Sequence, residues 1–386
     1  MLRVREIARR MNNTAETPEA TLDRVCPGII AQHAPAVDRD GAFPSESIRA
    51  LASSGLVGAL SSKESGGLEL GFAGAARVVR RVAEECGSTA MVLTMHYCGA
   101  TVVEGFGPPE TRRAIAAGSH LSTLAFSEAG SRSHFWAPAS TAEKRDGHVV
   151  LNASKSWVTS ASNATAYVWS SKPLAAEGLS TMWLVPASAE GVQVRGPFHG
   201  LGLRGNDSLP VAATDVKVPG EAMLGSDGKG FDIMMTTVLP IFAVLSAACS
   251  VGLMTGGLRR TIEHATRTRH EDTGSSLADL PTIRAYLARM RVKTDMCDAL
   301  LSDTIDAIAS GRADAALRIL ECKTAAGETA NEVLDLGMRV CGGAAFRKDV
   351  AVERFFRDAR AAGVMAPTTD ILYDFIGKAV CGMPLF

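Results

Sequence analysis

The stretch HVVLNASKSWVTS, residues 148–160, marks a change of texture along the chain. It is rich in Val, Ser and Thr, it carries a Trp, and the turn pair Asp146–Gly147 precedes it. β-Branched and aromatic residues favour strands, and Asp-Gly favours the tight turn of a hairpin. Five comparable runs, LSTLAFS, AYVWSS, TMWLVPA, VQVRG and AATDVKVP, accompany it within residues 121–225. We therefore expect a small β-barrel or sandwich over residues 121–225.

The flanking regions have a helical texture. Residues 1–120 contain runs of helix formers that open at proline or serine and close at glycine, as in PSESIRALASSGL and PPETRRAIAAG. Within residues 278–311, apolar residues recur at helical spacings of three, four or seven positions. The order of helices, strands and helices predicts an α+β fold with an N-terminal helical domain over 1–120, a β domain over 121–225 and a C-terminal helical bundle over 226–386.

Composition limits the kinds of partner. The 386 residues carry a formal net charge of −1, which gives no general attraction for nucleic acid or for an anionic membrane. The eight cysteines are scattered without metal-ligand spacing, which indicates reduced thiols in a cytoplasmic protein and no metal site. Residues 233–258 lack charge and could span a bilayer by length, but their Pro, Gly, Ser and Thr content favours a helix buried in a bundle.

Four motifs occur in a meaningful order. They are LAFSEAGSRSHF at 124–135, KSWVTSASNAT at 155–165, RVCGGAAF at 339–346 and VERFFRDARAAGVMAPTTDIL at 352–372. Small residues such as those after Ser127 allow a backbone to approach a planar ligand closely. Together the motifs resemble those of the acyl-CoA dehydrogenase family over nearly the whole chain. The resemblance implies FAD as cofactor, a C-terminal four-helix bundle and assembly into a dimer or tetramer.

The resemblance also implies roles for particular residues. The indole of Trp157 would pack against the flavin, and the hydroxyl of Thr159 would hydrogen-bond to it. In the family, the Gly-Gly segment reaches the dinucleotide of a neighbouring subunit. The residues that this resemblance places at FAD are Phe126, Ser127, Gly130, Ser131, Trp157, Thr159, Arg269, Arg339, Gly342, Gly343, Thr368 and Asp370.

The position of the family's catalytic base is the main departure. Counting from the Arg-Asp-Ala-Arg run puts Ala366 where the family commonly has Glu, and the second base location offers only Ile241 and Phe242. A positioned base contributes on the order of 10²–10⁴-fold to such a reaction. The substitute candidates are His134, Asp370, His96 and Tyr97; His96 lies in an apolar helix and is expected to be a core histidine.

Several functions stay open from the residues and the resemblance. An FAD-dependent dehydrogenase acting on an acyl thioester, carried by coenzyme A or by a carrier protein, is the first interpretation. A flavin-dependent monooxygenase on the same fold is the alternative, because it needs no α-proton base. A non-catalytic flavin- or ligand-binding protein is the second alternative, and without the resemblance a helical interaction scaffold with a β insert is also consistent with the chain.

Overall fold

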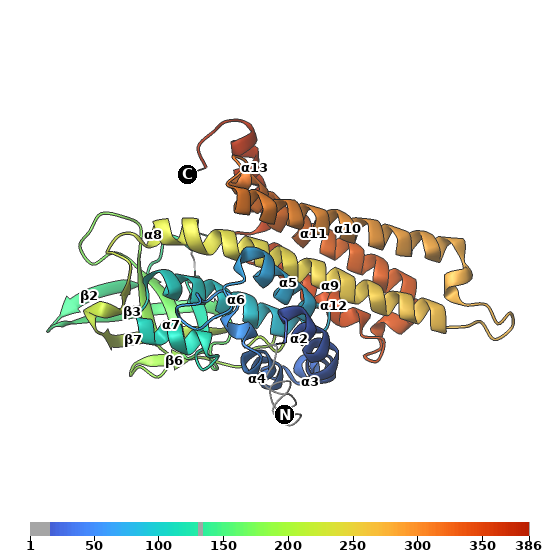
Figure 1. Ribbon diagram of the computed structural model, residues 1–386, viewed down its shortest axis with the longest axis horizontal. Coiled ribbons are helices and arrows are strands. Elements are labelled where there is room, and N and C mark those ends of the chain that lie inside the picture. The colour runs from blue at the N-terminus through green and yellow to red at the C-terminus, as the bar shows by residue number, and fades with distance from the viewer. Residues whose placement is uncertain (1–15, 130–133, 386) are drawn as a thin grey trace, which may run out of the picture.

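The computed structural model describes residues 16–129 and 134–385. Three parts follow one another in space as in sequence: a helical N-terminal part, two β-sheets, and a long helical bundle (Figure 1). The sheets lie at one end of the bundle and the N-terminal helices lie along its side (Figure 1). This arrangement confirms the predicted α+β fold.

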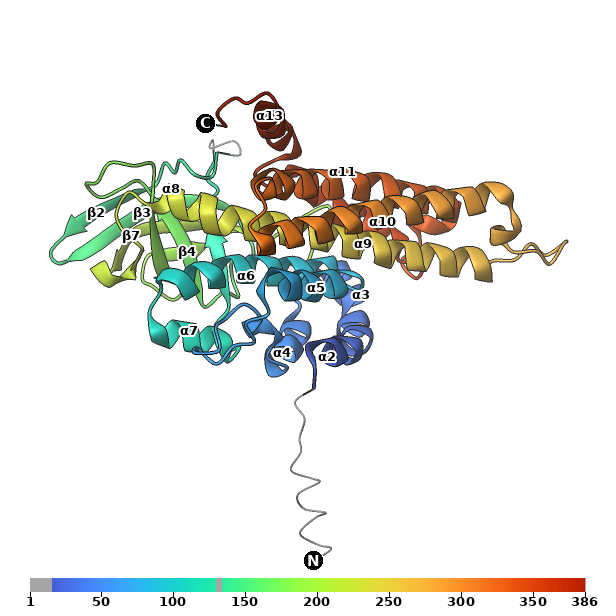
Figure 2. The same cartoon turned by 45° about the horizontal axis from the view of Figure 1, so that its top comes forward.

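The N-terminal helices form a layer against the bundle. Helices α5 and α6 lie between the remaining N-terminal helices and the bundle (Figure 2). Helix α6 is apolar on every side and is buried along most of its length, which suits a central position. The helices of this part are α2 (Pro18–Val25), α3 (Ala31–Asp40), α4 (Ser45–Ser53), α5 (Gly71–Ala83), α6 (Gly87–Phe106) and α7 (Pro109–Ala116).

The strands form two four-stranded sheets, ordered β1-β4-β5-β8 and β2-β3-β7-β6. Strand β1 runs parallel to β4, whereas the other pairs are antiparallel. Two strands, β2 and β8, were not predicted, because the first is polar and largely exposed and the second is only two residues long. The strands are β1 (Ser122–Ala125), β2 (Thr141–Arg145), β3 (His148–Val158), β4 (Ala166–Ser171), β5 (Thr181–Pro186), β6 (Val192–Val194), β7 (Leu209–Val218) and β8 (Met223–Leu224).

Strand β4 is buried on both faces because it separates two cores. Tyr167 and Trp169 belong to the core between the sheets, together with Trp183 of β5. Val168, which points the opposite way, belongs to the large helical core instead. The sheet β1-β4-β5-β8 thus packs the β part against the helical core.

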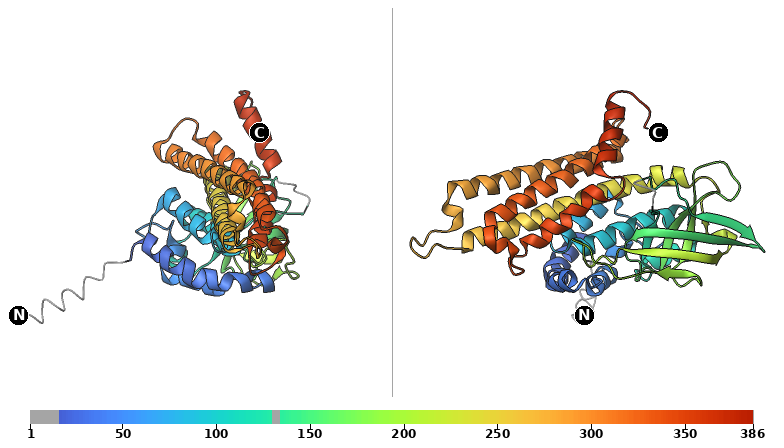
Figure 3. Two further views of the ribbon diagram at one scale, coloured as in Figure 1. Left: turned by 90° about the vertical axis from the view of Figure 1, so that its right-hand side faces the viewer. Right: turned by 180° about the vertical axis from the view of Figure 1, so that it is seen from behind.

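The C-terminal part is a bundle in which α9, α10, α11 and α12 run side by side, while α13 projects from it (Figures 1 and 3). Helix α8 leads through one π-helical turn, Met234–Val238, into α9, so that 38 residues form one continuous helix. The helices are α8 (Gly230–Ile233), α9 (Leu239–Arg267), α10 (Pro281–Ser310), α11 (Ala315–Cys341), α12 (Val352–Val364) and α13 (Thr369–Val380).

The long helix from Gly230 to Arg267 passes a length and hydropathy test for a membrane span. However, 83% of its most apolar window is buried inside the protein. A helix that is apolar on all sides is expected in the core of a large bundle. The structure therefore agrees with the prediction of a buried bundle helix.

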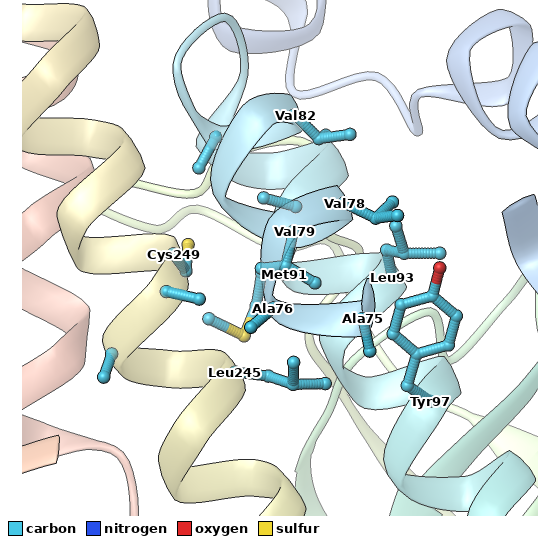
Figure 4. Packing of buried hydrophobic residues seen from close by; sticks show 14 of the residues in the cluster. Ala75, Ala76, Val78, Val79, Val82, Met91, Leu93, Tyr97, Leu245 and Cys249 are labelled. Atoms are coloured by element: carbon cyan, nitrogen blue, oxygen red, sulfur yellow. The ribbon is translucent and has the colours of Figure 1, made fainter. Parts of the chain in front are cut away.

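Helix α9 approaches α5 very closely through two glycines. A Cβ at Gly252 would lie 2.2 Å from the carbonyl oxygen of Arg80, and one at Gly256 would lie 2.3 Å from that of Glu84. Apolar side chains of α5 and α6, including Val79 in Figure 4, fill the rest of this contact. Glycine is therefore required at both positions for the two helices to pack.

Candidate active site

Two of the sequence motifs lie next to each other at the edge of the β part. The backbone N–H of Ser156 donates to the carbonyl oxygen of Ser127 over 2.8 Å. The hydroxyl of Thr123 donates to the carbonyl oxygen of Thr159, also over 2.8 Å. Segment 124–129 therefore runs beside the end of β3. Gly130 and Ser131 of the first motif lie outside the described residues.

A buried ion pair fastens these two motifs together. The ammonium of Lys155 lies 2.6 Å from a carboxylate oxygen of Glu128, and it also donates to the carbonyl oxygen of Ser170 over 2.7 Å. Burial lowers the pKa of Lys155 to about 8, although Glu128 opposes this shift. Burial tends to raise the pKa of Glu128, but the Lys155 charge and the hydrogen bonds from Lys155, Ser140 and the Ala139 N–H together outweigh this effect and leave that pKa below its ordinary value. The pair was not predicted, although both residues stand inside the motifs.

Trp157 leaves the regular strand. The register of β3 on β7 shifts between Lys155 and Val158, and Trp157 has a φ of 57°, an uncommon value for a residue other than glycine. Its indole is 71% exposed, while the neighbouring Thr159 is buried. Strained backbone that turns a large apolar ring into solvent marks candidate ligand sites. A planar aromatic ligand could stack on this indole.

Phe126 is a core-facing residue of the first motif. It is buried, and its ring stacks on that of Phe135 at a centroid distance of 6.5 Å. Its carbonyl oxygen is 3.5 Å from the Lys155 ammonium. Phe126 therefore supports the segment from the core side, and Ser127 is the partly exposed residue that follows it.

The loop between α12 and α13 carries the position of the missing base. Ala366 is partly buried and packs against the main core, and Thr368 holds the N-cap position of α13 without a capping hydrogen bond from its side chain. The carboxylate of Asp370 is exposed on the first turn of that helix. On α9, Ile241 and Phe242 are both buried. An apolar residue therefore occupies each of the two positions at which a base was expected.

A buried lysine that was not predicted lies between these two positions. The ammonium of Lys323, on α11, donates to the carbonyl oxygens of Pro367 at 2.8 Å, Met365 at 3.1 Å and Ala362 at 3.4 Å. It also lies 5.8 Å from the ring centroid of Phe242. Burial lowers its pKa to about 8. The only sequence signal was a lysine within the apolar stripe of a long helix.

The histidine and tyrosine candidates are placed differently from one another. His96 is fully buried; its Nε2 lies 3.2 Å from the carbonyl oxygen of Val57, and its Nδ1 accepts the N–H of Ser122. Burial lowers the pKa of His96 to about 4. Tyr97 is likewise buried. His96 thus has the core environment that its apolar helix suggested.

His134 is exposed, and among the described residues no hydrogen bond joins it to the loop of Ala366. Its ring lies 5.0 Å from that of Trp136, and Trp136 in turn lies 6.2 Å from the ring of Phe375 on α13. These aromatic contacts join the end of the first motif to α13.

The other residues predicted to bind FAD lie at the far end of the helical bundle. Arg339 stacks over the ring of Tyr286, at the start of α10, with a distance of 5.2 Å to the centroid. Gly342–Gly343 follows at the exposed end of α11. Arg269 is exposed in the loop before α10 and donates to the carbonyl oxygen of Gly274 over 2.9 Å. Figures 1 and 3 show that this end of the bundle is remote from the sheets.

Comparison with known proteins identifies the class of protein. Family models for the N-terminal, middle and C-terminal domains of acyl-CoA dehydrogenases match residues 13–118, 123–216 and 228–381. The chain therefore belongs to the acyl-CoA dehydrogenase family. It is an FAD-dependent oxidoreductase that acts on an acyl thioester.

Individual relatives are distant but span the chain. A cyclohex-1-ene-1-carbonyl-CoA dehydrogenase from Geobacter metallireducens is 27% identical over 96% of this chain and 99% of its own length. The structure of butyryl-CoA dehydrogenase from Megasphaera elsdenii matches with a TM-score of 0.87 at 21% identity, covering 94% of this chain and 98% of the other. A prolyl acyl carrier protein oxidase matches with a TM-score of 0.82 at 18% identity, covering 91% and 96%.

Proposed function

We propose that the flavin ring of FAD binds at the exposed indole of Trp157, beside Ser127, Thr159 and Thr368. The exposure of this indole supports the proposal, because a large aromatic ring held in a strained backbone gains most from a stacking partner. When bound, FAD supplies a hydride acceptor. The chain supplies the stacking surface and backbone and hydroxyl groups for the ring edge.

The second group of residues then serves a neighbouring subunit. Arg269, Arg339 and Gly342–Gly343 lie at the end of the bundle remote from the sheets, so within one chain they are far from strand β3, which carries Trp157 (Figures 1 and 3). Their exposed guanidinium groups suit the phosphates of a dinucleotide. We therefore propose a dimer or tetramer in which each FAD is shared between subunits.

The proposed reaction is oxidation of an acyl thioester by an enzyme whose base is non-standard or absent. The observation that carries this proposal is the apolar pair Ala366 and Phe242 with the Lys323 ammonium between them. The three carbonyl acceptors around Lys323 occupy all of its donors and favour the protonated form, which cannot accept an α-proton. Lys323 therefore holds the loop and is not the base.

The carrier of the acyl group stays open between coenzyme A and a carrier protein. Relatives of both kinds match the chain along most of its length. We place the protein in the cytoplasm, because all eight cysteines are free and seven of them are buried.

Monooxygenation is the second candidate function. It is favoured by the same observation, since both base positions are apolar. A hydroxylase that uses reduced flavin and oxygen needs no group at Ala366 that accepts a proton from carbon.

One experiment separates the two functions. The FAD-loaded protein is mixed without oxygen with a panel of acyl thioesters, and flavin absorbance is followed; in parallel it is reduced with NAD(P)H and exposed to oxygen with candidate acceptors. Bleaching by a thioester supports dehydrogenation, whereas oxygen-dependent hydroxylation of an added compound supports the alternative. Failure of the purified protein to take up FAD would contradict both.

A further inference from the structure

A small cavity, lined mainly by apolar atoms, lies next to the loop of Ala366. Residues of α6, α9 and α12 line it together with Leu203, and Met365, directly before Ala366, forms part of its wall. The space open to water-sized groups is about 10 Å³, which is room for roughly one such group. Its polar lining residues are Ser246, Ser250 and Asp358.

Ser246 contributes a hydroxyl without a partner. It lies on α9 one turn after Phe242, so both side chains project on the same side of the helix. It is 2% exposed, and no described residue forms a hydrogen bond with its Oγ atom. An unsatisfied buried hydroxyl costs roughly 1–3 kcal/mol. A ligand that brings a hydrogen-bonding group to this atom would therefore be favoured over an apolar one.

Asp358 contributes an acceptor to the same cavity. It is buried on α12, and one oxygen of its carboxyl accepts the N–H of Leu203 over 2.6 Å. Burial raises its pKa to about 6. A carboxylate has about four acceptor positions. It can accept a further hydrogen bond from a donor that enters the cavity.

We infer that this cavity receives the distal end of a short acyl group and selects a hydroxyl there over a methyl group. The ligand hydroxyl would accept a hydrogen bond from Ser246 and donate one to Asp358. The inference rests on the proposed function, since it places the acyl α-carbon near Ala366. Met91 and Leu253 line the same space and leave no room for a longer chain.

The test measures binding instead of turnover. Pairs of thioesters, each an ω-hydroxyacyl compound and the compound with methyl in place of hydroxyl, are titrated by calorimetry into the FAD-loaded and FAD-free protein. Thioesters of coenzyme A and of pantetheine are both used, so that the carrier does not decide the outcome. The hydroxylated member of one short pair should bind about tenfold more tightly, the value of a well-made buried hydrogen bond.

Two variants and one control locate the effect. Ser246→Ala and Ser246→Val should each reduce the preference to about threefold or less, because neither side chain offers a hydrogen-bond donor. Thr266→Ala, at an exposed site near the end of the same helix, should leave the tenfold ratio unchanged. A ratio near one in the unaltered protein, as expected if the cavity holds only a water molecule, would overturn the inference. So would a ratio that Ser246→Ala does not change. Neither result would affect FAD uptake, which tests the proposed function separately.

Discussion

The Lys155 ammonium lies 2.6 Å from the Glu128 carboxylate, and both side chains are buried at the junction of the two motifs that flank the proposed flavin surface. Buried pairs of this kind contribute little net stability, yet removing one partner is costly, because the other charge is left without compensation. The pair therefore acts mainly to fix the relative position of segments 124–129 and 155–159.

Removing the charge on Lys155 should disturb both folding and the flavin surface. Lys155→Met leaves Glu128 buried without its cation, and we expect a loss of about 3–5 kcal/mol in the free energy of unfolding. Urea denaturation would measure it. The double variant Lys155→Met with Glu128→Leu should recover much of the stability. If the single variant is as stable as the unaltered protein, the buried pair does not exist as described.

Trp157 should matter for cofactor binding and hardly at all for folding. Its indole is 71% exposed, so Trp157→Ala removes few protein contacts and should change the melting temperature little. Stacking surfaces of this size contribute about 0.5–1.5 kcal/mol beyond area burial. We therefore expect FAD affinity to fall at least about tenfold in Trp157→Ala and to be largely retained in Trp157→Phe, as measured by equilibrium dialysis. Equal affinities for all three proteins would refute the stacking role.

The glycines of α9 should tolerate no side chain. Gly252→Ala places a methyl group 2.2 Å from a carbonyl oxygen of α5, and overpacking of this kind costs about 1–3 kcal/mol. Gly377→Ala is the matched control, because nothing lies within 4 Å of its added Cβ in helix α13. That control should gain up to about 1 kcal/mol from helix propensity. Thermal unfolding of both variants would test the close contact.

Lys323 should give stability a distinctive pH dependence. Burial lowers its pKa to about 8 from an ordinary value of 10.5. Between these two values the unfolded chain keeps a proton that the folded chain has lost, so the free energy of unfolding rises with pH. Relative to Lys323→Met, the unaltered protein should thus become more stable as the pH is raised from 8 to 10. A difference that stays constant over this range would contradict the burial of the amine.

Local sequence patterns were sufficient for the order of elements but not for the surroundings of the site. The alternation of Val, Thr and aromatic residues in β3, β4 and β5 and the glycine and proline boundaries of α4 and α7 carried enough information to predict the α+β arrangement.

The site depends on contacts between residues far apart in the chain. The Lys323 ammonium meets carbonyl oxygens about forty positions away, and such meetings are fixed by how helices pack, which local patterns do not encode. The lack of a hydrogen-bond partner for the Ser246 hydroxyl also depends on how the helices pack, so local patterns could not predict it. The left-handed backbone of Trp157 accompanies an irregularity in β3. The residue type at this position gave no sign of that irregularity.

The most direct measurement concerns Ala366. The rate of anaerobic flavin reduction by saturated acyl thioesters should be compared between the unaltered protein and Ala366→Glu, with Ala366→Gln as the uncharged control of equal size. If the base position is vacant, the carboxylate should raise the rate by about 10²-fold or more with at least one thioester, and Gln should not. Brisk reduction by the unaltered protein, with no gain from Glu, would show that another group already removes the α-proton and would contradict the account.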